Sequence, residues 1–197
     1  MRARITRAVY PMLLRGCGAA SVLGSMLFVA WGYIDKPNIS ANLRMVTYVL
    51  ASTVPTLFLV GMVGIVVLCG GQFGVLGWTG TALACYGSGL AAIANVVRVA
   101  PLLYGYFLEQ GWPPSLIEWL AVMDTGLILV GLAILRTRRL RVLGAIAFVI
   151  GATGWAYDLT DSAGVALQVA PRFVHVGFGL LFSLGWVVLG LVLWRRP

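Results

Sequence analysis

The chain has 197 residues, of which 60% are hydrophobic and only 10% are charged, and its mean hydropathy is +0.96. A soluble domain is about 45–50% apolar and about 25% charged. The composition therefore excludes a cytosolic enzyme, a disulfide-framed secreted module and a disordered chain, and it indicates an integral membrane protein. It does not identify a reaction or a ligand.

Six apolar runs follow one another along the chain, each close to the roughly 20 residues that cross about 30 Å of hydrocarbon. They lie at about 12–34, 45–69, 74–99, 116–135, 140–158 and 171–194. We therefore expect an all-α fold, a polytopic bundle of six transmembrane helices. The residues between the runs are too few for a soluble domain of ordinary size, so residues 1–197 are expected to form a single transmembrane domain.

Basic residues are concentrated at the chain ends and in alternate connections. Retained Lys and Arg mark the cytoplasmic side of a membrane protein. With the N-terminus inside, the inner side holds ten of the fourteen basic residues and none of the six acids: Arg2, Arg4, Arg7, Arg15, Arg136, Arg138, Arg139, Arg141, Arg195 and Arg196. We therefore predict an N-in, C-in protein of a bacterial-type cytoplasmic membrane. A nucleic-acid partner is not expected, because these residues do not line one amphipathic surface.

The third run carries polar residues at a regular spacing. Thr81, Ser88 and Asn95 follow at intervals of seven, and Arg98 lies three residues further on, which places all four on one face of a helix. Two interpretations fit this face. One is a packing contact with small residues at every fourth position from Gly80; the other is a polar lining that descends from Arg98.

Asp124 lies about 13 Å beyond the start of the fourth helix, at 1.5 Å per residue. A charge near the bilayer centre costs at least about 2.5–3.5 kcal/mol, and such residues usually face the bundle interior and mark ion or proton routes. We expect Arg98 to be its partner. The alternatives are a structural ion pair, a carboxylate that handles a proton or cation, and an unpaired side chain that reaches towards the surface.

Three other helices contribute candidates for a ligand or ion pathway. Pro55 leaves the carbonyl of Ala51 without its usual donor and bends the second run beside Thr56. Asp158 shares a face of the fifth run with two glycines, and His175 lies about one turn into the sixth, as an interfacial histidine or a ligand. The candidate pathway residues are Arg98, Asn95, Ser88, Asp124, His175, Thr56 and Asp158.

Neither a cofactor nor a metal is expected from the sequence. A single histidine excludes bis-histidine haem, and His175 with Asp158 and Asp161 is a weak zinc-ligand set. The chain has no nucleotide-binding loop and no redox cysteine pair. Aromatic residues near the outer helix ends, Trp31 and Tyr157 among them, are typical of an interfacial belt.

Ser88 in Gly87-Ser88-Gly89, together with His175 on the last helix, resembles the serine–histidine dyad of rhomboid intramembrane proteases, whose core also has six helices. This chain departs from that pattern in three ways. Tyr86 replaces the first glycine of the motif, the serine lies on the third helix where the family uses its fourth, and there is no second histidine. An intramembrane hydrolase is therefore only a remote alternative.

Two functions remain from the sequence. The first is transport or permeation of a small solute or ion through an outward-facing polar cavity, without catalysis. The second is a noncatalytic accessory or assembly subunit of a larger membrane complex. The expected partners are the lipid bilayer and either other membrane subunits or further copies of the chain.

Overall fold

The computed structural model describes residues 2–34, 40–99, 116–137, 140–167 and 172–195, and within them it is all-helical with no strand. Six of the helices are long and apolar enough to cross a membrane, as the sequence predicts. The elements are α1 (Arg2–Ile34), α2 (Ala41–Cys69), the short 3₁₀ helix η1 (Gly70–Gln72), α3 (Gly74–Val99), α5 (Leu116–Arg136), α6 (Arg141–Leu167) and α7 (Arg172–Arg195).

Two helices are longer than their apolar runs. Helix α1 begins at Arg2 instead of near position 12, and α6 continues to Leu167 instead of ending near position 158. Their candidate membrane spans are shorter, Tyr10–Ile34 and Arg141–Thr160. Hydropathy marks only the apolar part of a helix, whereas backbone hydrogen bonds continue through flanking polar residues.

The connection between α2 and α3 is a tight turn. Gly74 has φ +55°, a left-handed conformation that glycine adopts without the steric cost of a Cβ. The amide of Phe73 donates to the carbonyl of Gly70 at 3.4 Å, and the amide of Gly77 donates to that of Phe73 at 3.1 Å. The sequence places a break here, and the structure shows that only a few residues reverse the chain.

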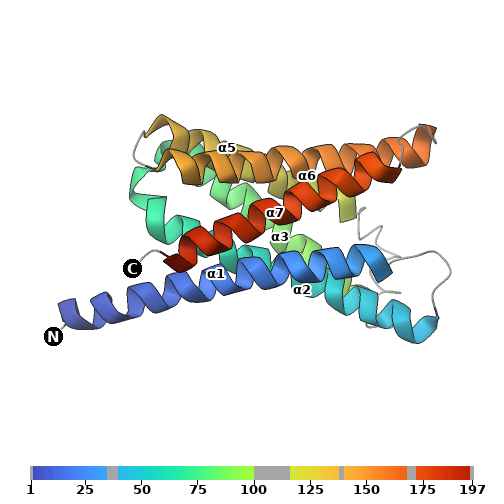
Figure 1. Cartoon of the computed structure of the whole chain (residues 1–197), viewed down its shortest axis with the longest axis horizontal. Helices are drawn as coiled ribbons and strands as arrows, with labels where there is room; N and C mark the ends of the chain where they lie inside the picture. Colours follow the sequence, from blue (N-terminus) through green and yellow to red (C-terminus); the bar gives the residue numbers. More distant parts are fainter. Residues whose placement is uncertain (1, 35–39, 100–115, 138–139, 168–171, 196–197) are drawn as a thin grey trace.

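The six helices form a closed ring. Each packs against its neighbour along the chain, and α7 completes the ring by packing against α1. The start of α1 and the end of α7 lie at the same end of the bundle, together with the α2–α3 turn and the adjoining ends of α5 and α6 (Figure 1). This end, here called the basic end, holds Arg136 and Arg195 in the last turns of α5 and α7 and Arg141 at the start of α6.

Reciprocal glycine pairs bring three pairs of helices close together. A methyl group on Gly126 of α5 would lie 2.5 Å from the carbonyl oxygen of Gly80 on α3, and one on Gly80 would lie 2.7 Å from that of Gly126. The same reciprocal arrangement joins α1 to α7 and α5 to α6 through Gly18 with Gly190 and Gly131 with Gly144. The face of α3 that begins at Gly80 therefore serves as a packing contact, since small residues allow close approach of helix backbones.

Asn95 links α3 to α2 close to Pro55. Its side-chain amide donates to the carbonyl of Ala51 at 3.2 Å and to that of Ala91 at 2.8 Å. Pro55 has no amide hydrogen, so it cannot donate to Ala51, four residues earlier. The buried Asn95 thus supplies the donor that the proline withholds, and leaving a buried carbonyl without a donor is costly.

Replacing Asn95 by Leu is expected to lower the free energy of unfolding by about 1–3 kcal/mol, the cost of an unsatisfied buried acceptor. In a Pro55→Ala background the loss should be smaller, because residue 55 then has its own amide to donate to Ala51. Thermal unfolding in detergent measures both changes. Ser88→Ala is the matched control on α3, because the buried Ser88 Oγ has no hydrogen-bond partner among the described residues. Equal losses in the two backgrounds would contradict this role.

Candidate functional site

A cavity lies at the centre of the ring, in the half of the bundle away from the basic end. Five of the six helices line it, including two pairs that face each other across the ring, α1 with α5 and α2 with α6. Its volume is about 20 Å³, enough for about one water molecule. The lining residues are Phe28, Trp31, Ala51, Val54, Pro55, Phe58, Leu120, Met123, Asp124, Gly154, Tyr157, Asp158 and Phe182.

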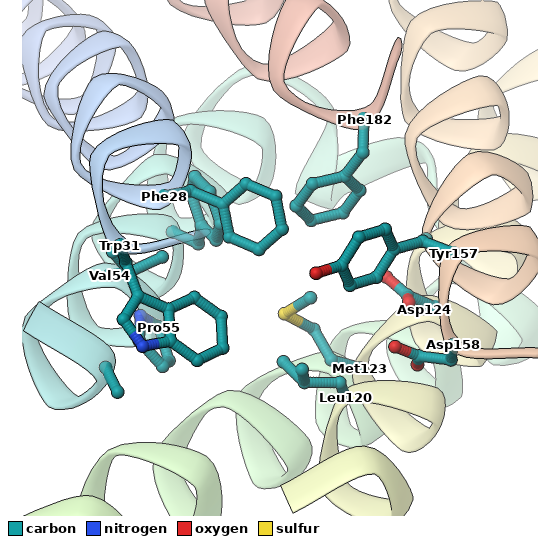
Figure 2. Close-up of a pocket in the computed structure, with 13 residues that line it drawn as sticks. Phe28, Trp31, Val54, Pro55, Leu120, Met123, Asp124, Tyr157, Asp158 and Phe182 are labelled. Carbon is teal, nitrogen blue, oxygen red and sulfur yellow. The ribbon is translucent and has the colours of Figure 1, made fainter. Parts of the chain in front are cut away.

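The cavity has an acidic side and an aromatic side. Figure 2 shows the carboxyl groups of Asp124 and Asp158 beside Tyr157, with Trp31 across the cavity from them and Phe28 along another wall. Asp124 is 1% exposed and Asp158 4% exposed. Two acids from adjacent helices therefore contribute to one buried, mainly apolar space.

Glycines of α6 make room for Asp124. A methyl group on Gly151 would lie 2.5 Å from the backbone carbonyl oxygen of Asp124, and one on Gly154 would overlap its carboxyl group. The carboxyl group therefore rests against the α6 backbone at Gly154. Its Oδ1 atom is buried and has no hydrogen-bond partner among the described residues. Leaving a buried polar atom without a partner is costly, so this oxygen is a candidate contact for a bound species or for a residue outside the described part of the chain.

Aromatic rings close the cavity towards the basic end and on the α7 side. Phe58 stacks on Trp186 with ring centroids 4.3 Å apart and an interplanar angle of 9°. Phe182 lies edge-on to Phe58, with centroids 5.6 Å apart, and 5.2 Å from Phe28. The stacked pair bridges α2 and α7 on the side of the cavity that faces the basic end.

The candidate residues identified from the sequence fall into separate places. Asp124 and Asp158 lie together in the cavity wall, while Asn95 serves the α2–α3 contact described above. Thr56 is exposed on α2 and donates to the carbonyl of Ser52 at 2.9 Å. The side chains of Arg98 and His175 lie outside the described residues, so their pairing stays a prediction.

Ser88 is fully buried on α3, and its Oγ has no hydrogen-bond partner among the described residues. Helix α7, which carries His175, lies opposite α3 in the ring. The arrangement of these helices therefore offers no support for the dyad considered from the sequence.

Sequence reasoning missed the aromatic wall and Gly154. Trp31 and Tyr157, expected in an interfacial belt, also line the cavity. A signal for Gly154 was present: Gly151, Gly154 and Asp158 follow at intervals of three and four, which places them on one helix face. The aromatic wall had no comparable signal, because its members come from four different helices.

The described fold and cavity define a class: an all-helical ring of six spans with the features of a multi-pass membrane protein and a central cavity lined by two acids and aromatic rings. No family model, curated protein or solved structure matches this chain.

Proposed function

We propose that the protein binds a small solute or ion in the central cavity and passes it across a membrane. The observation that supports this function is the position of Asp124 and Asp158, two buried acids facing one space at the centre of the ring. Acids inside a membrane protein are costly and usually mark ion or solute routes.

The proposed orientation places the basic end in the cytoplasm, in a bacterial-type inner membrane. The cavity then lies in the outer half of the bilayer, and the stacked Phe58 and Trp186 separate it from the cytoplasmic side. The solute would therefore enter from outside, and a change in helix packing would be needed for it to continue inwards.

Cysteine labelling tests the orientation and the cavity together. In a cysteine-free background, a cysteine at position 138 or 196 should resist an impermeant maleimide added from outside, and one at position 110 should react. A cysteine replacing Leu120 in the cavity wall should react slowly with a small thiosulfonate from outside only. Val130, fully buried but outside the cavity lining, is the control position and should stay unlabelled.

The opposite labelling pattern would show the opposite orientation. A cysteine at position 120 that does not react with the thiosulfonate would contradict a cavity accessible from outside. The three native cysteines must be replaced first. Cys17 and Cys69 are buried and Cys85 is only half-buried, so the unmodified chain would give background labelling.

An accessory subunit is the competing function. Small residues on its lipid-facing surface would favour that role. The reciprocal glycine pairs lie between helices of the same chain, whereas Gly16, Gly89 and Gly177 face open space. Purification in a mild detergent followed by mass spectrometry separates the two functions. A carrier is recovered alone or with its own copies, and an accessory subunit is recovered with a stoichiometric partner.

A further inference from the structure

An apolar groove adjoins the cavity between α1 and α7. Its volume is about 260 Å³, and its walls include Val29 and Gly32 of α1 and Val176 and Leu180 of α7. Val29, Val176 and Leu180 are all exposed on the outside of the bundle. The groove therefore opens sideways, towards lipid in the proposed setting.

Phe28 and Tyr157 form the wall that the groove and the cavity share, since both residues line both spaces. Their rings meet edge to face with centroids 5.6 Å apart. On the groove side, Tyr157 packs over Gly179, where a methyl group would lie 3.1 Å from the ring. If the rings of Phe28 and Tyr157 moved apart, the small acidic cavity would be joined to the larger apolar groove.

We infer that the cavity and the groove together bind a primary alkylammonium ion, with its –NH₃⁺ head beside Asp124 and Asp158 and its alkyl chain between α1 and α7. This inference rests on the proposed function, because it assigns a ligand class to the same cavity.

The size of the cavity selects the head group. A primary ammonium is about as large as the single water molecule that 20 Å³ holds, whereas a trimethylammonium head is several times larger. The three N–H donors of a primary ammonium match carboxylate acceptors. Oδ1 of Asp124, which has no hydrogen-bond partner among the described residues, is one such acceptor. Phe28, Trp31 and Tyr157 also line the cavity, and aromatic rings attract cations that lie over their faces.

The lining also favours a cation that carries an alkyl chain. Carboxyl oxygens accept hydrogen bonds from an ammonium group, and an ionised carboxylate offers no donor to an anion. An inorganic cation gains nothing from the apolar groove, so the groove favours a ligand with an alkyl chain.

Equilibrium titration of the whole chain in lipid nanodiscs tests the inference, with empty nanodiscs as the blank. The probes are hexylammonium, neutral hexanol and hexyltrimethylammonium. Hexylammonium should bind at least about tenfold more tightly than either of the others, a difference large enough to measure directly. Equal binding of hexanol, or displacement of hexylammonium by an equal concentration of Na⁺, would overturn the assignment.

Amino-acid substitutions test separately where the ammonium head and the alkyl chain of the ligand bind. Asp124→Asn and Asp158→Asn should each weaken hexylammonium binding at least about tenfold. Glu118→Gln, in the first turn of α5, makes the same change in net charge and should leave binding intact. Val176→Trp fills the groove, so it should weaken hexylammonium while sparing methylammonium. If the aspartate variants do not fold, the binding of hexylammonium, hexanol and hexyltrimethylammonium to the unaltered protein still tests the ligand class.

Vesicle uptake of hexylammonium distinguishes this inference from the proposed function. Binding without uptake would support the ligand class and contradict transport. A cavity cysteine that is labelled from outside, in a protein that does not bind hexylammonium, would support the cavity and overturn the ligand class.

Discussion

The Gly126→Ala variant should unfold far more easily than the unaltered chain. The added methyl group would overlap the backbone amide of Ala84 and lie 2.5 Å from the carbonyl oxygen of Gly80. Both neighbours are backbone atoms, so they can move away only if α3 and α5 separate. Overpacking a tight contact costs typically 1–3 kcal/mol, and we expect about 3 kcal/mol here, measured as a loss of thermal stability in detergent.

Gly89→Ala is the matched control for this prediction. Gly89 lies on α3, and a methyl group there would meet no atom within 4 Å. The same substitution should therefore be neutral or stabilise the protein by roughly 0.5–1 kcal/mol, the advantage of Ala over Gly inside a helix. If both variants melt at the same temperature, close backbone contact does not hold α3 against α5.

Asp124 and Arg98 should show strong energetic coupling. Their helices, α5 and α3, are neighbours in the ring, and a buried charge that loses its partner costs about 3–5 kcal/mol. Asp124→Asn and Arg98→Gln should each lower the midpoint of thermal unfolding, and the double variant should lose less than the sum of the two.

Strict additivity in this double-mutant cycle would show that the two groups do not meet. Arg98 would then not be the partner of the acids in the cavity. A different outcome is that the two residues are coupled and the Arg98→Gln variant folds but no longer binds hexylammonium. That result would show that Arg98 positions the carboxyl group that the ligand uses.

The spacing of residues along a single helix predicts which side chains share a face of that helix. It does not predict which other helix that face contacts. Asn95 shares its spacing with Ser88 and Thr81, yet each side chain serves differently. Thr81 donates to the carbonyl of Gly77, four residues earlier, at 2.9 Å, whereas Asn95 reaches Ala51 on another helix. The donor missing at Pro55 was visible in the sequence, but the residue that replaces it was not, because the two lie forty residues apart.

The amino-acid sequence alone determined the six membrane-length helices found in the described residues, their approximate limits and the position of Asp124 away from helix ends. These features depend on local properties, since apolar length and basic flanks act through a helix's own residues. Only the tertiary structure decided which side chains meet. Ring closure by α1 and α7 brings together Phe28, Tyr157 and the two acids. Such contacts depend on how the helices cross at their glycines. Hydropathy and residue spacing within one helix do not show how distant segments cross.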